Sequence, residues 1–330
     1  MLSRNENPWV IVGAMSAGFL FMLLLLMSLF GGLILAFAVI VSLPIFAVFL
    51  AMQFRSERQN AEVMNAGTAK AVERLHTPRS DWLPRSILSG FIASTAMLAT
   101  FFIAYGVALA FSSGGMEQQS GTASQNAMTL WLYNLTHNAI TDIGQASLYF
   151  AMGAHLATSL IMAALYAYLF EPRVGGADWT KGVYFSVLPW FLSVTIFFPL
   201  VGGGVFGVEL GAGPLPYLGN LVLHLVFGAT LGLMYGPLGD TLPGIEETQS
   251  AENQTAMRHA EKAAAIGIVG GMFLGLALAI GEHLALQPDS AIGQPASLAA
   301  ILGLTLIGGA LGSLVGTLVG LPGQGQTTNK

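Results

Sequence analysis

Long apolar segments alternate with short polar ones along the whole chain. A membrane-spanning helix needs about 20 consecutive apolar residues, and eight segments reach that length. They cover residues 9–29, 33–54, 84–111, 146–170, 181–201, 217–236, 263–281 and 297–320. The first two form one run without a charged residue from Pro8 to Met52. As a single helix this run would be about 68 Å long, more than twice the hydrocarbon thickness of a membrane. We therefore predict a turn at Gly31-Gly32 and an all-α bundle of eight transmembrane helices.

The basic residues all fall on one side of a bundle threaded in this way. Spans of alternating direction bring all 12 lysines and arginines to the same face, from Arg4 to Lys330. Because lysine and arginine concentrate on the cytoplasmic side of membrane proteins, both termini are predicted to be cytoplasmic. The charged residues on the opposite side are all acidic, and they are Glu117, Asp142, Glu209, Glu282 and Asp289.

The spans group into successive units. We predict an N-terminal hairpin over 1–54, a cytoplasmic helical linker over 55–83, a four-span core over 84–240, a second cytoplasmic linker over 241–262, and a glycine-rich hairpin with a tail over 263–330. Within the core, the outer insert 112–145 becomes amphipathic from Met128 onward, which indicates a helix lying in the membrane interface.

The core contains an internal repeat. His155-Leu156 and His224-Leu225 are each followed by a tyrosine eleven residues after the histidine, Tyr166 and Tyr235. Small residues stand four, eight and twelve positions after each histidine, and these are Ser159, Ala163, Ala167, Gly228, Gly232 and Gly236. The preceding spans both open on the same pair, Asp81-Trp82 and Asp178-Trp179. Eleven residues make about three helical turns, so each histidine shares a helix face with its tyrosine. Spans three–four and five–six are therefore predicted to be a parallel repeat of one hairpin.

This part of the chain resembles a known family. The features that carry the likeness, in order, are His155, Tyr166, Trp179-Thr180-Lys181-Gly182, Phe198-Pro199-Leu200 with Gly202, and His224-Leu225-Val226. Their order resembles the YagU-like family of bacterial inner-membrane proteins, over spans four to six only. The resemblance implies a bacterial plasma-membrane protein in which these histidines recur. It implies no substrate, because the family has no established biochemical activity.

Four interpretations of His155 and His224 stay open at this point. They could hydrogen-bond across helices and hold the bundle together. They could line a proton or ion pathway, since ionisable groups inside membranes are functional suspects and histidine changes charge near neutral pH. They could be the two axial ligands of a b-type haem. They could also bind a metal together with Glu282-His283, which with Glu209 form a candidate cluster on the outer side.

Glycines recur every four residues in the last two spans. Span seven carries Gly267, Gly271 and Gly275, and span eight carries Gly308, Gly312, Gly316 and Gly320. This spacing places small residues on one helix face, where two helices can approach closely. We predict contact between these spans or, in a homo-oligomer or membrane complex, with another chain.

The composition of the chain excludes several classes of function. Only 9% of residues are charged, against about 25% in soluble proteins, which makes the lipid bilayer the main partner. No basic tract indicates a nucleic-acid-binding surface. The absence of cysteine excludes disulfides and iron–sulfur clusters. No catalytic motif of a known class occurs, so we expect no enzyme. The predicted function is transport or sensing of a small solute or ion, with an accessory subunit of a membrane complex as the alternative.

Overall fold

The computed structural model describes residues 14, 16–18, 20–22, 78, 81–116, 127–146, 148–175, 177–236, 247–286 and 295–320. These residues are helical almost throughout and include no strand, as the predicted all-α class requires. The first two predicted spans lie outside them apart from short pieces between Ala14 and Met22. The turn at Gly31-Gly32 and most of the linker 55–83 also lie outside the described residues.

Six helical segments of the described chain are long and apolar enough to cross a membrane. They are Trp82–Ser112, Leu148–Arg173, Asp178–Leu200, Leu215–Tyr235, His259–Ala285 and Ala300–Gly320. Each lies where one of the predicted spans three to eight was expected. The chain is therefore a multi-pass membrane protein by the length and composition of its helices. The eight-span count itself remains a prediction.

The helices that form these segments are joined by shorter elements. The long ones are α3 (Trp82–Met116), α6 (Leu148–Leu165), α7 (Asp178–Leu192), α9 (Leu215–Tyr235), α10 (Glu247–Leu286) and α11 (Pro295–Gly320). π-Helical turns extend α6 over Tyr166–Phe170 and α7 over Ser193–Phe197. The short elements are 3-10 turns over Glu171–Arg173 and Val205–Leu210, α8 (Phe198–Leu200), and the helices α4 (Ala127–Thr136) and α5 (Ala139–Ala146). Acidic and proline residues favour the first turn of a helix, and Asp178, Pro216 and Pro295 occupy it in α7, α9 and α11.

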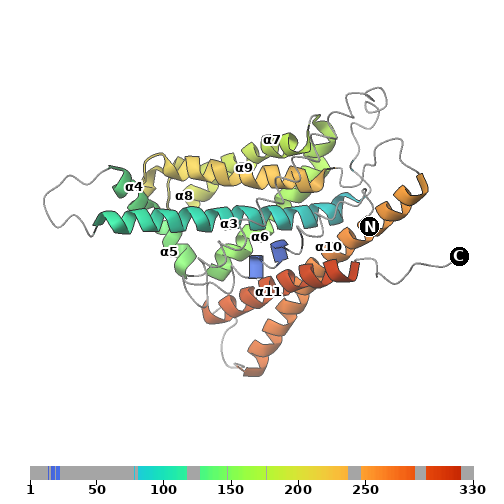
Figure 1. Cartoon of the computed structure of the whole chain (residues 1–330). Helices are drawn as coiled ribbons and strands as arrows, with labels where there is room; N and C mark the ends of the chain where they lie inside the picture. Colours follow the sequence, from blue (N-terminus) through green and yellow to red (C-terminus); the bar gives the residue numbers. More distant parts are fainter. Residues whose placement is uncertain are drawn as a thin grey trace.

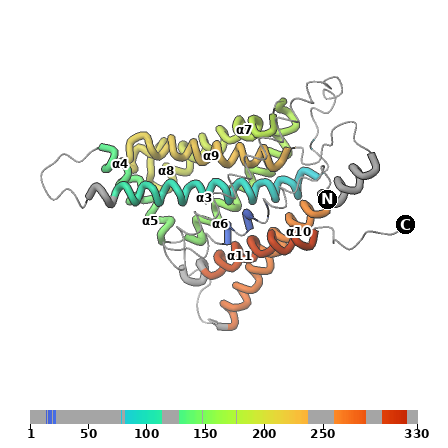
Figure 2. The backbone as a smooth tube through the Cα atoms, in the orientation of Figure 1, coloured from blue at the N-terminus to red at the C-terminus, as the bar shows by residue number. Residues whose placement is uncertain are grey.

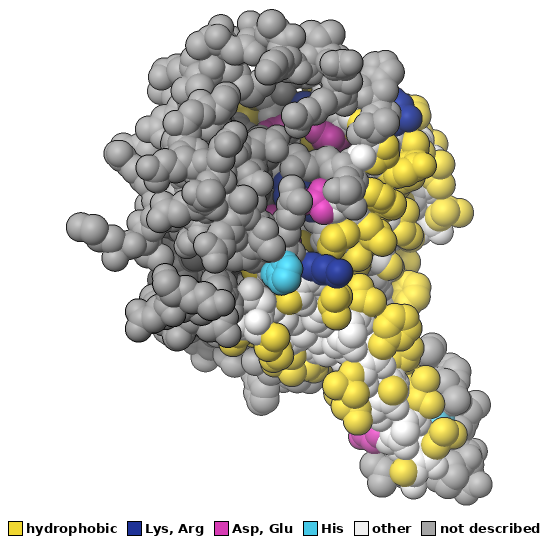
Figure 3. Space-filling view, turned by 90° about the vertical axis from the view of Figure 1, so that its right-hand side faces the viewer, with side chains coloured by type: hydrophobic (Ala, Val, Ile, Leu, Met, Phe, Trp, Pro, Cys, Tyr) yellow, Lys and Arg dark blue, Asp and Glu magenta, His cyan; other side chains and the backbone are white. Residues whose placement is uncertain are grey.

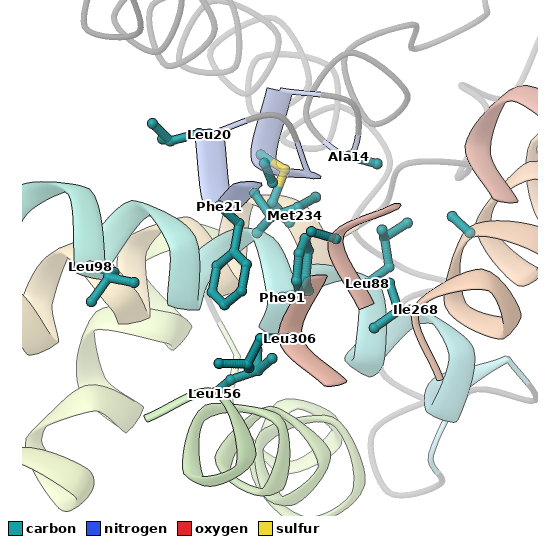
Figure 4. Close-up of a cluster of buried hydrophobic side chains, with 14 of the residues drawn as sticks. Ala14, Leu20, Phe21, Leu88, Phe91, Leu98, Leu156, Met234, Ile268 and Leu306 are labelled. Atoms are coloured by element: carbon teal, nitrogen blue, oxygen red, sulfur yellow. The ribbon is translucent and has the colours of Figure 1, made fainter. Parts of the chain in front are cut away.

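Helix α3 is the centre of the bundle (Figure 1). It contacts α6, α9 and α10, while α7 packs along α9 and α11 along α10. Its buried face carries Leu88, Phe91 and Ile92, which meet Leu156 of α6 and Ile268 of α10 in one apolar cluster (Figure 4). The backbone trace shows α10 and α11 as one hairpin laid against this core (Figure 2).

Large apolar side chains also cover the outside of the molecule. Phe111, Leu200, Phe273 and Val319 are each more than three-fifths exposed, and hydrophobic side chains spread over the described part of the face in Figure 3. Water would penalise such a surface, whereas the hydrocarbon of a bilayer covers it without cost. The surface and the lengths of the helices therefore agree on a membrane location.

The basic residues of the described chain lie at one end of the bundle only. The starts of α3 and α7 and the ends of α6 and α9 meet at one end, which carries Arg85, Arg173, Lys181 and Lys262 and is called the basic end here. The other end, called the acidic end, carries Asp142, Glu209 and Glu282. The alternating direction of the six segments produces this separation.

The glycines of α10 and α11 face one another. A Cβ on Gly271 would overlap the backbone carbonyl of Gly308, and one on Gly267 would overlap that of Gly312. The rest of the contact is equally close, with Gly275 against Leu304, Gly316 against Ala263 and Gly320 against Ala260. The two helix backbones therefore touch between Ala260 and Gly275 of α10 and between Leu304 and Gly320 of α11.

Helices α7 and α9 approach as closely. Gly182 of α7 lies directly on the backbone of Gly228, and Gly232 lies on the carbonyl of Asp178. At the end of α9, Gly236 lies against the Asp178 carboxylate. In the other core hairpin the small residue of α6 that faces α3 is Ala163, opposite Gly90.

The two core hairpins do not pack in the same register. Gly90, opposite Ala163, stands eight residues after Trp82, whereas Gly182, opposite the matching Gly232, stands three residues after Trp179. Both hairpins bring small residues together, but at different heights. The parallel repeat therefore stays a prediction from the sequence.

Helices α4 and α5 and the glycine-rich loop 202–214 lie together at the acidic end. The Asn134 side-chain amide of α4 donates to the carbonyl of Gly211 at 2.9 Å, and the Trp131 ring lies against Gly213. Gly211 and Gly213 have positive φ angles, and glycine adopts that conformation without strain. The loop thus has a defined path across the end of α9.

Candidate functional site

His155 of α6 points into the bundle. The side chain is half-buried, and its Nε2 lies 3.1 Å from the backbone carbonyl of Ser94 in α3. A carbonyl oxygen can only accept, so Nε2 carries the proton and donates it. In the neutral ring the other nitrogen, Nδ1, is then an acceptor, and no described residue hydrogen-bonds to it.

His224 of α9 is buried and uses the opposite nitrogen. Its Nδ1 donates to the carbonyl of Asn220, one turn earlier in the same helix, at 2.8 Å. Nε2 is then the free acceptor of the neutral ring, again without a hydrogen bond to a described residue. Helices α6 and α9 both pack against α3, and Tyr166 and Tyr235, eleven residues after the two histidines, are in ring contact. The two sequence-predicted histidines therefore stand at one level of the bundle.

Asn220 extends this level to a fourth helix, the α7 segment. Its Nδ2 donates to Ser193 Oγ at 3.2 Å. Ser193 begins the π-helical turn of the α7 segment, four residues after Pro189. A π-turn inserts an extra residue into a helix and is frequent at functional sites. Ser94, His155, Ser193, Asn220 and His224 are called the polar layer below.

Two atoms of the polar layer are buried without a hydrogen-bond partner among the described residues. They are Ser94 Oγ and Asn220 Oδ1, and Ser94 is completely buried. An unsatisfied polar group in a membrane costs several kcal/mol, on the order of the cost in an apolar solvent. With Nδ1 of His155 and Nε2 of His224, the layer holds three free acceptors and one free hydroxyl.

Tyr166 and Tyr235, predicted on the same faces as the histidines, meet each other. Their ring centroids are 5.6 Å apart and nearly perpendicular, at 85°. Phe185 of α7 completes the group, 5.3 Å from Tyr166. Both tyrosines are fully buried. They lie three turns beyond the histidines, toward the basic end.

A buried arginine at the basic end was missed as a site residue by the sequence analysis. Arg85 is 3% exposed, and its Nη2 lies 3.2 Å from Asp81 and 3.3 Å from Glu261. Its Nη1 donates to the carbonyl of Gly236 at 2.9 Å, and that of Tyr235 lies 3.4 Å away. One side chain thus joins α3, α9 and α10. The sequence signal was a charge just inside a span, counted only as a marker of orientation.

The candidate outer-side cluster does not form. Glu209 and Glu282 are exposed, one on the loop before α9 and the other on α10, and the adjacent His283 is buried within α10. No group of three His, Asp or Glu side chains in the described part of the chain is arranged to hold a metal ion. The metal site expected from His155, His224, Glu282 and His283 is therefore absent there.

The layer does not fit a b-type haem either. Iron would take a histidine through a ring nitrogen directed at the macrocycle. Nε2 of His155 is instead bound to the Ser94 carbonyl of the neighbouring helix. This contact joins α6 directly to α3, in the place where a macrocycle would need to stand.

Comparisons with known proteins give no relative. No protein-family model matches the chain, and neither a curated protein nor a solved structure matches it.

Proposed function

We propose that the protein is a membrane transporter for a small, uncharged solute rich in hydrogen-bond donors, and that the polar layer binds this solute in transit. The observation that carries the proposal is the pair of buried polar atoms without a described partner in that layer, Ser94 Oγ and Asn220 Oδ1, beside the second ring nitrogens of His155 and His224. Polar groups inside a membrane are costly and mark substrate pathways. A solute that satisfies them would recover that cost while it is bound.

The polar layer favours a solute with hydrogen-bond donors over one with acceptors. With both rings neutral, His155 Nδ1, His224 Nε2 and Asn220 Oδ1 all accept, while Ser94 Oγ can also donate. A molecule with several N–H or O–H groups, such as urea or glycerol, complements this set. No predicted span has an Asp or Glu at its middle, so an ion would find no opposite charge there, and burying it would be expensive.

We also propose a bacterial plasma membrane as the location, with both termini in the cytoplasm. The basic end supports this orientation, because basic residues favour the cytoplasmic side. The bacterial origin is supported by the likeness of spans four to six to the YagU-like family.

The test is solute flux in proteoliposomes, followed by light scattering after a urea or glycerol gradient is applied. We expect protein-dependent flux that falls about tenfold in His224→Asn, because one lost hydrogen bond of about 1.4 kcal/mol changes a rate by that factor. Asparagine keeps a donor near the Asn220 carbonyl but removes the acceptor Nε2. Ser94→Ala should lower the flux similarly.

The matched control is His137→Asn. His137 is exposed between α4 and α5, outside the polar layer, so its variant should transport as the native protein does. Absence of protein-dependent flux, or equal flux in the native protein, His224→Asn and Ser94→Ala, would contradict the proposal. Flux of protons or potassium ions instead would exclude the uncharged solute.

A further inference from the structure

We propose that the polar layer is closed toward the basic end by a gate made of an aromatic plug and a buried ion-pair network. The inference rests on the transport function proposed above. The plug consists of Tyr166, Phe185 and Tyr235, and the network of Asp81, Arg85 and Glu261. The gate opens when α10 moves relative to α3 and Arg85 separates from Glu261.

The plug stands directly beyond the polar layer. Tyr166 and Tyr235 follow the two histidines by eleven residues, about three helical turns, and on the same faces. The Tyr166 ring meets Tyr235 at 85° and Phe185 at 65°, and all three side chains are buried. A solute that leaves the layer toward the basic end therefore meets these rings first.

Tyr235 connects the plug to the ion-pair network. Its ring packs on Tyr166, while its carbonyl and that of Gly236 lie 3.4 and 2.9 Å from Arg85 Nη1. These carbonyls end α9 and carry the negative end of its dipole, which a guanidinium stabilises. A displacement of Arg85 would thus release the turn of α9 that holds the Tyr235 ring.

Glu261 gives α10 control of that arginine. The Arg85 and Glu261 side chains are 4% and 5% exposed, and their charged atoms are 3.3 Å apart. Asp81, in the turn before α3, is 20% exposed and stays with Arg85 as its i,i+4 partner. When α10 moves, Arg85 keeps the Asp81 carboxylate, so the arginine is not left without a counter-ion.

The physics of buried ion pairs suits a contact that opens. Desolvation of both charges offsets most of their attraction, so such a pair adds little net stability over apolar packing. Water that enters when the helices separate recovers the desolvation cost. An apolar seam at the same place would have no such compensation. The ion-pair network therefore adds little free energy to the closed state, while its geometry fixes how α10 packs on α3.

The experiment uses the natural absence of cysteine. Ser94→Cys adds one thiol in the polar layer, and labelling by a charged, membrane-impermeant maleimide reports access from each side in membrane vesicles of both orientations. Lys262→Cys, exposed at the basic end, marks which vesicles present that end. We expect Ser94→Cys alone to react at least about tenfold more slowly than Lys262→Cys from the basic end, since most molecules are closed.

Glu261→Gln added to Ser94→Cys should raise that labelling rate about tenfold, because it weakens the closed state. Glu282→Gln, an exposed glutamate on the same helix, is the control and should change nothing. If Glu261→Gln fails to elute as a folded protein, Tyr166→Leu opens the plug without touching the charges and should raise labelling in the same way.

Equal labelling of Ser94→Cys in the native, Glu261→Gln and Tyr166→Leu backgrounds would overturn the gate. Labelling does not require a transported solute, so the two proposals fail separately. A gate that responds to Glu261→Gln without any urea or glycerol flux would contradict the proposed function alone. Flux with no change in access would contradict the gate alone.

Discussion

In each histidine of the polar layer, one ring nitrogen donates a hydrogen bond to a backbone carbonyl. The other ring nitrogen has no hydrogen bond to a described residue. His155 binds across to α3 through Nε2, while His224 binds within α9 through Nδ1. These contacts select opposite tautomers. The two residues, alike in the sequence, therefore differ in what they do for stability: only His155 links two helices.

This difference predicts unequal effects on stability. His155→Ala should lower the free energy of unfolding by about 0.6–2 kcal/mol, the range for hydrogen bonds between membrane helices. His155→Gln should retain most of the native stability, because the glutamine amide can place a donor where Nε2 stood. Thermal unfolding in mild detergent, followed by tryptophan fluorescence, measures both. A glutamine variant as unstable as the alanine variant would show that the Ser94 contact contributes nothing.

At this scale the sequence predicts faces but not partners. An interval of eleven residues puts histidine and tyrosine on one face of each helix, whatever the packing. The contact of Arg85 with Glu261 depends on how α3 and α10 are placed against each other, and Asn220 with Ser193 depends on a π-helical turn. Neither the placement nor the turn is encoded in a local pattern of residues.

Among the elements, α10 and α11 form the closest pair. Their backbones touch at successive glycines, with no side chain between them at Gly267, Gly271 and Gly308. Attraction between helices in lipid comes from such close packing, because lipid tails are as apolar as leucine. The hairpin should therefore be sensitive to any side chain added on this face and indifferent to one added beside it.

Two adjacent glycines of α10 test this directly. A Cβ on Gly271 would overlap the Gly308 carbonyl, while one on Gly270 meets nothing within 4 Å. Gly271→Ala should cost about 1–3 kcal/mol of stability, as overpacking does, and Gly270→Ala should be neutral or slightly stabilising, since alanine favours helix. The midpoints of thermal unfolding in detergent compare the two. Equal midpoints would mean that the helices can separate without cost.

The six spans that the structure describes were predictable from apolar length, and their bounds agree with the predicted ones within about one helical turn. The four-residue glycine spacing predicted a close contact in the last hairpin but left its partner open. The register of the core hairpins was not predictable. Gly90 meets Ala163 and Gly182 meets Gly232 at different heights, because residue volume, not order along the chain, decides where two helices fit.

The basic side chains of the described residues lie at one end of the molecule, where several of them pair with carboxylates. Arg85, Lys181 and Lys262 gather at one end of the bundle, and Asp142, Glu209 and Glu282 at the other. Membrane insertion retains lysine and arginine on the cytoplasmic side. The separation seen in the structure is the arrangement that this rule requires, although the geometry of the bundle is the same in either orientation.

Orientation can be tested with single cysteines in intact bacterial cells. Glu209→Cys, exposed at the acidic end, should react with an impermeant maleimide added to the medium, and Lys262→Cys should react only after the membrane is opened. Both side chains are exposed, so access to the reagent differs only by side. The opposite labelling result would show that the predicted orientation is wrong. The proposed gate would then face the outside of the cell.

The Arg85 network also has a consequence for how the protein is made. Glu261 emerges from the ribosome roughly 180 residues after Arg85, a delay of about 10–35 s at ordinary rates of synthesis. During that interval α3 must enter the bilayer with its arginine lacking one carboxylate. Asp81, four residues earlier in the chain, is present from the start and can neutralise it. Asp81 thus allows α3 to insert before α10 is made. The ion pair of Arg85 with Glu261 forms only when α10 has been synthesised.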